Sequence, residues 1–162
     1  MIFVCVGSRD YQFNRLIEKL DELVGNGTIK EEIVAQIGKS QYEPKNYKWF
    51  RFLDASDFKE YQKNSDLIIS HAGTGALIGA LKLEKQVIAV PRLAKYGEHI
   101  DDHQTQISTA LKDEGYLREV LDMNDLADTI RECYENPIQK KYDRPSYVID
   151  IIDEFLSNLN AT

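Results

Sequence analysis

The chain has 162 residues, of which 43% are hydrophobic and 29% are charged, and its formal net charge is −7. This composition is that of a soluble globular protein with one domain, and the negative charge argues against a bulk nucleic-acid binder, which would carry a basic face. No stretch approaches the ~20 apolar residues of a membrane helix, and two distant cysteines predict buried thiols in a reducing cytoplasm rather than a metal site.

Short apolar runs alternate with helical patterns along the chain. The first run, residues 2–6, is nearly all apolar and lacks the basic leader of a signal peptide, so we expect a buried strand that Gly7 ends. Apolar residues between 13 and 24 then recur at helical spacing. The same criteria predict strands at 33–37, 48–53, 67–70, 87–90 and 116–121, and helices at 56–61 (with Ser56 as the N-cap), 76–83, 105–111, 126–134 and, as an amphipathic C-terminal helix, about 146–159.

This alternation predicts an α/β fold: a Rossmann-like doubly wound parallel sheet of about six strands, with helices on both faces, in a single domain spanning residues 1–162. Ligands of such folds bind beyond the carboxyl ends of the strands, near the point where the strand order reverses. The segments expected at that edge are 7–10, 38–40, 71–75 and 91–104.

A glycine-containing turn, His71-Ala72-Gly73-Thr74-Gly75, joins an expected strand to an expected helix. Glycines remove Cβ atoms where a ligand would approach, and the free N–H groups of the helix start favour a phosphate. A short Gly-x-Gly is common, however, and fits a tight packed connection equally well. His71 is correspondingly either a site residue or a hydrogen-bonded core residue. After the first strand, Gly7-Ser8-Arg9 either faces the same phosphates or is a polar connector.

The segment 91–104 is long for a strand–helix connection and rich in polar side chains, which suggests recognition of a hydroxyl-rich molecule. Within it, His99 and His103 are four residues apart and Asp102 is adjacent. The glutamate and third ligand of known zinc motifs are missing, so we expect no metal, and the carboxylates also suit a plain helix N-terminus.

Three segments together resemble the C-terminal domain of glycosyltransferase family 28, from residue 2 to about residue 121. They are the first-strand VCVGS turn, the HAGTG turn at 71–75 and the PRLAKYGEHIDDHQ loop that ends in Asp-His-Gln at 102–104. That domain binds the UDP-sugar in MurG-type enzymes. The loop is similar to those of stand-alone donor subunits of two-piece transferases in bacterial capsular and exopolysaccharide synthesis.

The resemblance implies the C-terminal half of the GT-B glycosyltransferase fold and a donor site without metal or cofactor. The implied diphosphate-binding residues are Gly7, Ser8, Arg9, His71, Gly73, Thr74 and Gly75. The implied donor sugar- or nucleotide-binding residues are Arg92, Glu98, Asp102, His103 and Gln104. The reaction would displace UDP from the anomeric carbon of the donor sugar. The amides of 73–75 and a cation such as Arg9, Arg92 or Lys95 would stabilise the negative charge on the departing UDP, and His71 or His103 could assist proton transfer.

At two places the chain departs from the family pattern. Gly79 stands where the family commonly has a glutamate that bonds the ribose hydroxyls, and Glu84-Lys85-Gln86 replaces a frequent Gly-Lys-Pro. Uridine selection therefore stays open. The missing glutamate favours the alternative of a non-catalytic nucleotide(-sugar)-binding regulatory module, and a lone epimerase-like or hydrolytic enzyme is a third reading.

The acceptor domain of the two-domain enzymes does not fit into this length. We therefore expect a membrane-anchored acceptor-binding partner subunit, a polyprenyl-linked saccharide acceptor, and a cytoplasmic location at the inner face of the membrane through that partner. The helix at about 146–159 would dock the partner or pack on its own sheet, and the chain alone could form a homodimer. The expected function is that of the donor-binding and catalytic subunit of a UDP-sugar transferase for bacterial surface polysaccharide.

Overall fold

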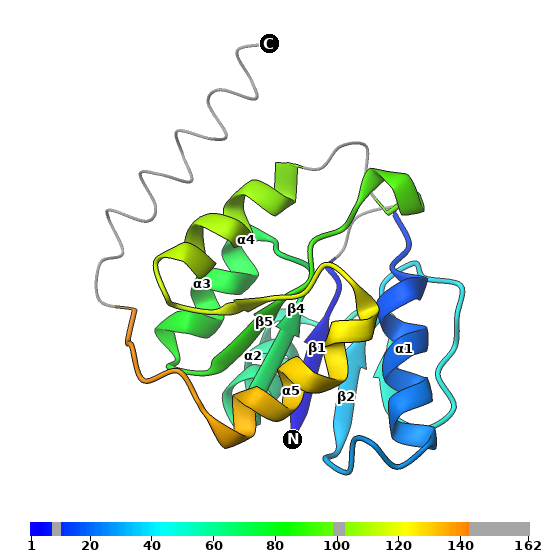
Figure 1. Ribbon diagram of the computed structural model, residues 1–162. Coiled ribbons are helices and arrows are strands. Elements are labelled where there is room, and N and C mark those ends of the chain that lie inside the picture. The colour runs from blue at the N-terminus through cyan, green and yellow to red at the C-terminus, as the bar shows by residue number, and fades with distance from the viewer. Residues whose placement is uncertain (8–10, 99–102, 143–162) are drawn as a thin grey trace.

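A computed structural model describes residues 1–7, 11–98 and 103–142. Within these ranges six strands pair in parallel in the order β3-β2-β1-β4-β5-β6 (Figure 1). The strands are β1 (Ile2–Cys5), β2 (Ile33–Gln36), β3 (Lys48–Phe50), β4 (Leu67–Ser70), β5 (Gln86–Ala89) and β6 (Arg118–Glu119). The predicted Rossmann-like parallel sheet is confirmed.

The strand order reverses between β1 and β4. From β1 the chain builds outward through β2 to β3, then returns to place β4 on the other side of β1 and continues to β5 and β6. The register pairs Ile2 with Leu67 and Cys5 with Ser70, so the carboxyl ends of β1 and β4 lie side by side. This is the position at which open α/β sheets bind their ligands.

Helices cover both faces of the sheet (Figure 1). The helices are α1 (Asn14–Gly25), α2 (Ala55–Asn64), α3 (Thr74–Lys82), α4 (His103–Asp113) and α5 (Leu126–Glu135), with short 3-10 turns η1 (Ala94–Tyr96) and η2 (Met123–Asp125). In β1, Ile2 and Val4 pack in the core under α1 and α5, whereas Phe3 and Cys5 pack in the core under α2, α3 and α4. Both faces of β1 are buried, as its nearly continuous apolar sequence predicts.

Several boundaries differ from the expected ones. The third strand ends at Phe50 and the sixth shrinks to Arg118–Glu119. The prediction of Ser56 as an N-cap is wrong, because α2 begins earlier: the Asp54 carboxylate accepts a 2.8 Å hydrogen bond from the Asp57 amide and is the cap. Helix α4 likewise begins at His103 rather than 105. The expected helix at 146–159 lies outside the described residues.

Three buried polar or ionisable side chains, Cys5, Cys133 and Asp21, lie inside the domain. Both cysteines are buried free thiols, as expected, and burial raises the pKa of Cys5 to about 11, so the thiol stays protonated. Asp21 of α1 is also buried and accepts hydrogen bonds from the Tyr42 hydroxyl and the amides of Lys45 and Asn46. Burial alone would raise the pKa of Asp21, but these hydrogen bonds outweigh it and hold the pKa below its ordinary value.

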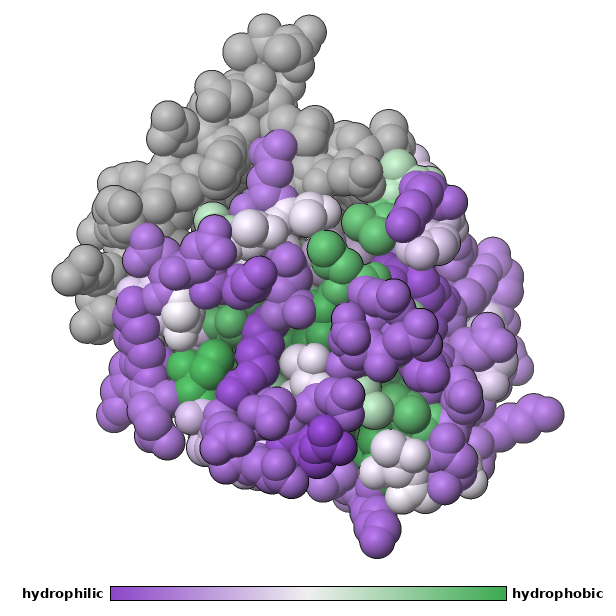
Figure 2. All heavy atoms as spheres, viewed as in Figure 1, coloured by the Kyte–Doolittle hydropathy of each residue, from purple (hydrophilic) through white to green (hydrophobic). Residues whose placement is uncertain are grey.

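The exterior is mostly hydrophilic in the view of Figure 2, and apolar groups show there only in small separate areas. Among the described residues, no helix is long and apolar enough to cross a membrane.

Candidate functional site

The carboxyl ends of β1 and β4 bring Gly7 and His71 into contact. The His71 amide donates to the Cys5 carbonyl at 3.2 Å, so the chain after β4 stays against β1 for one residue beyond the strand. The His71 side chain is buried, and its Nδ1 lies 3.3 Å from the same Cys5 oxygen. A carbonyl oxygen only accepts, so this contact is a hydrogen bond when Nδ1 carries a proton.

The imidazole packs closely against two glycines. A Cβ added at Gly7 would lie 2.7 Å from His71 Nε2, and a Cβ added at Gly73 would lie 2.3 Å from it. Both distances are shorter than a real carbon contact, so a side chain at either position requires the ring to move. Part of the reason for glycine at 7 and 73 is therefore internal: the two residues make room for His71.

The turn itself has an unusual backbone. Ala72 is buried and has φ of 68°, in the left-handed region that costs a residue with a Cβ about 1–2 kcal/mol. Such conformations persist where the surroundings hold them and cluster at functional sites. This turn reverses the chain between β4 and α3 so that the first residues of α3 start directly at the switch point.

The N-terminus of α3 is open. Its N-cap is Gly73, which has no side chain to accept from the first amides, and the first turn carries no acidic residue. The first N–H groups of a helix have no partner within the helix and, with the helix dipole, attract anions. Gly75 is exposed, and a Cβ there would meet none of the described residues within 4 Å. Unlike Gly73, Gly75 therefore has no described neighbour that requires a glycine.

The loop after β5 places two predicted donor-contacting side chains inside the protein. Arg92 is 1% exposed, and its guanidinium donates to the Tyr11 carbonyl at 2.7 Å and to the Val6 carbonyl. Glu98 is fully buried and pairs with Arg15 of α1. Both side chains are thus engaged with the protein's own groups, and their contact with the donor stays a prediction. Lys95, in the same loop, is exposed.

The remaining predicted residues are described only in part. Ser8, Arg9 and Asp102 lie outside the described residues, as does His99 of the metal alternative. His103 and Gln104 form the first turn of α4, and Thr74 begins α3; the positions of these three side chains are not described. The part of the chain that the structure describes contains no group of three or more His, Cys, Asp or Glu side chains arranged to hold a metal.

One residue that the sequence did not single out is central to this edge. Arg15 looks like an ordinary surface arginine of an amphipathic helix, because its neighbours Leu16 and Ile17 supply the buried stripe. It is 14% exposed and bonds to the loop after β5 and to the segment after β6. Two features of the sequence could have indicated the Arg15–Glu98 pair. Arg15 directly precedes the first apolar residue of α1, and Glu98 is the one glutamate in the Pro91–Gln104 loop.

Fold and site define a class: a Rossmann-like α/β domain with a glycine-containing turn and an open helix N-terminus at its switch point. Within that class the chain belongs to the glycosyltransferase family 28 C-terminal domain, whose model matches residues 1–152. The resemblance seen in the three sequence segments is thereby confirmed.

The curated relatives are subunits of a transferase. The UDP-N-acetylglucosamine transferase subunit ALG13 of Debaryomyces hansenii is 30% identical over 103 residues, which are 59% of this chain and 47% of that protein. The subunit of the same name from Mus musculus is 27% identical over 127 residues, or 71% of this chain and 10% of that protein. The chain thus spans less than half the length of these relatives.

Solved structures share the fold. A solution structure of ALG13 superposes with a TM-score of 0.58 at 20% identity, covering 90% of this chain and 92% of that one. The crystal structure of the glycotransferase of kitacinnamycin gives a TM-score of 0.59 at 15% identity, covering 99% of this chain and 40% of that one. The second match covers only part of a longer glycosyltransferase, as expected for a chain that corresponds to one half of the GT-B fold.

Proposed function

We propose that this chain is the donor-binding and catalytic subunit of a UDP-sugar glycosyltransferase. The observation that carries the proposal is the uncapped N-terminus of α3 at the switch point, with Gly75 exposed and clear of the other described residues. Membership of family 28 and the relatives' names as UDP-N-acetylglucosamine transferase subunits support a nucleotide-sugar as the ligand.

The chemistry proposed is displacement at the anomeric carbon with UDP as the leaving group. The amides of Thr74, Gly75 and Ala76, with the helix dipole, would hold the charge that develops on the diphosphate. Such fixed donors need no reorganisation during the reaction, which makes a bound metal unnecessary for this step. Arg9 and Lys95 are the cations proposed to assist. Arg92 is not, because its guanidinium is bonded to carbonyls of the first loop.

A partner subunit would supply the acceptor. We propose a membrane-anchored acceptor-binding subunit and a polyprenyl-linked saccharide, with the chain held at the inner face of the membrane through that subunit. The word "subunit" in the relatives' names supports a partner. The bacterial capsular or exopolysaccharide setting is supported by the PRLAKYGEHIDDHQ loop alone, since the relatives named above come from a yeast and a mouse.

A non-catalytic nucleotide-sugar-binding module is the second candidate. It is favoured by the position of His71, a proposed proton-transfer residue that is buried and packed against Gly7 and Gly73. Gly79 favours it as well, because a glycine has no side-chain carboxylate to accept hydrogen bonds from the ribose hydroxyls. The two candidates differ in whether sugar is transferred once the acceptor subunit is present.

Isothermal titration of the chain with UDP, UDP-glucose, UDP-galactose and UDP-N-acetylglucosamine tests both candidates. We expect at least one UDP-sugar to bind, and to bind more tightly than UDP alone. Radiolabelled transfer to a polyprenyl-linked acceptor should then require both this chain and its partner. Binding of no UDP compound, with or without the partner, contradicts the proposal. Binding without transfer in the complete complex selects the second candidate.

A further inference from the structure

A buried arginine crosses the switch point. Arg92 follows β5 and is 1% exposed. Its guanidinium donates to the carbonyl of Val6, which follows β1, and to the carbonyl of Tyr11 at 2.7 Å. It also lies 5.3 Å from the centroid of the Phe13 ring. Because β4 lies between β1 and β5 in the sheet, this side chain connects the ends of two strands that are not neighbours.

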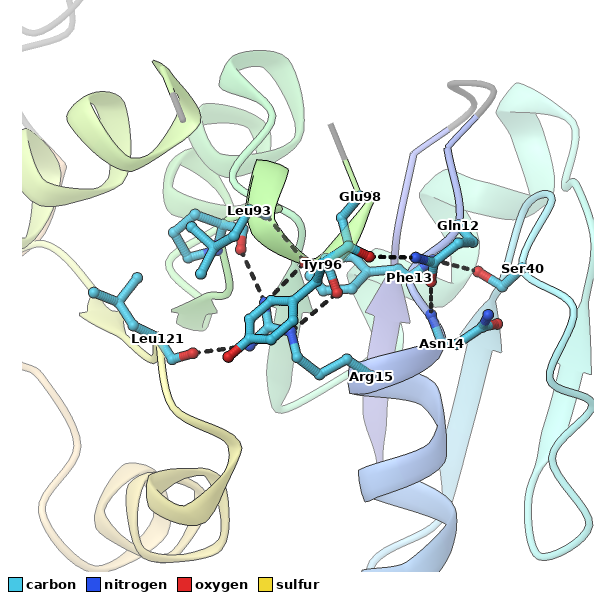
Figure 3. Close-up of polar contacts among 10 residues, drawn as sticks. Gln12, Phe13, Asn14, Arg15, Ser40, Leu93, Tyr96, Glu98 and Leu121 are labelled. Atoms are coloured by element: carbon cyan, nitrogen blue, oxygen red, sulfur yellow. Dashed lines mark hydrogen bonds and ion pairs between the residues drawn. The ribbon is translucent and has the colours of Figure 1, made fainter. Parts of the chain in front are cut away.

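The backbone that carries Arg92 is held on both sides of it. The Pro91 carbonyl accepts a hydrogen bond from Arg15 Nη2 at 3.3 Å, and the Leu93 amide donates to Glu98 Oε1 at 3.0 Å. Arg15 and Glu98 also pair with each other, with Nε 3.0 Å from Oε2 (Figure 3). The Arg92 side chain therefore starts from a loop that is fixed to α1.

At the far end of the contact, Arg92 holds the peptide group between Val6 and Gly7. The Val6 amide donates to the Gln36 carbonyl at 3.2 Å and the Val6 carbonyl accepts from Arg92, so both backbone polar groups of Val6 are engaged. The same planar, trans peptide group contains the Gly7 nitrogen, and its C=O and N–H point in opposite directions. The hydrogen bond from Arg92 therefore fixes the direction of the Gly7 N–H, which points away from the guanidinium.

The Gly7 N–H is available to a ligand beside the start of α3. Within residues 1–7, 11–98 and 103–142, no group accepts a hydrogen bond from it, and Gly7 is partly exposed. A Cβ at Gly7 and a Cβ at Gly73, the N-cap of α3, would both lie within 3 Å of His71 Nε2. The two glycines thus border the same imidazole, close enough for one diphosphate to meet the N–H groups on both segments.

We infer that Arg92 is a positioning residue for the donor diphosphate, acting through the Val6–Gly7 peptide group. The Gly7 N–H donates to a phosphate oxygen, and Arg92 holds that N–H in the required direction without touching the donor. The inference rests on the proposed function. Stability alone is a weak reason for such a residue, because taking a guanidinium out of water costs several kcal/mol.

The first test follows the Gly7 amide of the ¹⁵N-labelled wild type by NMR. Addition of UDP should move the Gly7 amide proton downfield, because a charge-assisted hydrogen bond to a phosphate forms. Uridine, which has no phosphate, should leave that resonance in place. A chain that binds UDP without a shift at Gly7 overturns the inference. A wild type that does not bind UDP or any UDP-sugar contradicts the proposed function, and the inference with it.

The second test removes the guanidinium and measures UDP affinity by titration calorimetry and stability by urea unfolding. Arg92→Met should bind UDP about tenfold more weakly and lose the Gly7 shift. Arg92→Lys keeps the charge but cannot hold two carbonyls with a planar fork, so it should show the same loss, and it replaces the methionine variant if that one does not fold.

Arg118→Met is the matched control. Arg118 also bonds to the carbonyl of a distant segment, at Asn136, but it stands in the edge strand β6, with β5 between it and β4. This variant should lose stability and keep the wild-type UDP affinity. Wild-type UDP affinity in a folded Arg92 variant overturns the inference, and so does an equal loss of UDP affinity in Arg118→Met.

Discussion

Replacing Gly73 with alanine tests the packing of His71 at the switch point. The added Cβ would lie 2.3 Å from Nε2 and 2.8 Å from Cε1 of the ring, whereas carbon atoms in contact are about 3.5–4.0 Å apart. The backbone itself accepts alanine, because Gly73 has φ of −70° and ψ of 132°. The ring also packs against Gly7, where a Cβ would lie only 2.7 Å from the same nitrogen.

Forcing extra volume into a packed site costs about 1–3 kcal/mol, and we expect Gly73→Ala to lower the free energy of unfolding by that amount. Gly75→Ala is the control: its Cβ meets nothing within 4 Å, and alanine is the better helix former by up to about 1 kcal/mol. Urea unfolding can be followed by the fluorescence of the single tryptophan, Trp49, which is half-buried in the edge strand β3.

The double variant Gly73→Ala/His71→Ala isolates the contact. With the ring absent, Gly73→Ala should cost nothing, so the coupling energy of the cycle should equal the whole cost of the single substitution, about 1–3 kcal/mol. If Gly73→Ala were equally destabilising with and without His71, the glycine would be required by something other than the imidazole, and the packing argument would fail.

Three further substitutions follow from other contacts. Asp21→Asn should destabilise by about 2–3 kcal/mol, because an amide donor then faces the donors that Asp21 accepts from. Because the pKa of Asp21 is lower in the folded than in the unfolded chain, the carboxylate stabilises the fold fully above about pH 4, and this stabilisation is lost as pH falls through the folded-state pKa. The difference in unfolding free energy between wild type and Asp21→Asn, measured in urea, should therefore shrink in acid. A difference that does not change with pH contradicts this. Glu84 follows the C-terminus of α3 with φ of 61°, and its amide and that of Lys85 donate to the carbonyls of Leu81 and Ala80, a Schellman motif that favours glycine. Glu84→Gly should therefore raise Tm by about 2–4 °C in calorimetry, and a lower Tm refutes the argument. Gly79→Glu should fold normally, since its Cβ makes only a 3.7 Å contact with Gln62, and should tighten UDP binding several-fold but not 2′-deoxy-UDP binding; equal gains for both place position 79 away from the ribose.

The fold could be predicted because the sequence patterns that specify its strands and helices are local and recur along the chain. The four inner strands β1, β2, β4 and β5 sit in apolar runs followed by a glycine-containing turn or a proline, and the helices between them keep the 3.6-residue period, so the alternation alone predicts a parallel sheet. The boundaries were less accurate where two signals compete. Asp54 and Ser56 are both good N-caps, and only the path of the chain after β3 decides in favour of Asp54.

The site was predictable in location but not in the direction of its side chains. Sequence order indicates that Gly7, His71 and the loop after β5 share an edge, because parallel strands present their carboxyl ends together. It does not indicate which side of a loop a charge faces. Arg92 and Glu98 were predicted to bind the donor, and the sequence gives no sign that both are buried and bonded to Val6 and Arg15, which lie more than 80 residues away in the chain.

The central claim is that a nucleotide diphosphate-sugar binds at the N-terminus of α3, and titration of UDP-N-acetylglucosamine into wild type and Gly75→Val tests it most directly. The valine side chain starts in open space, so the variant should keep the wild-type unfolding curve while its side chain occupies the approach to the first amides of the helix. The account predicts binding by the wild type and none measurable by the folded variant. A folded Gly75→Val chain that binds the donor as tightly as the wild type would contradict it.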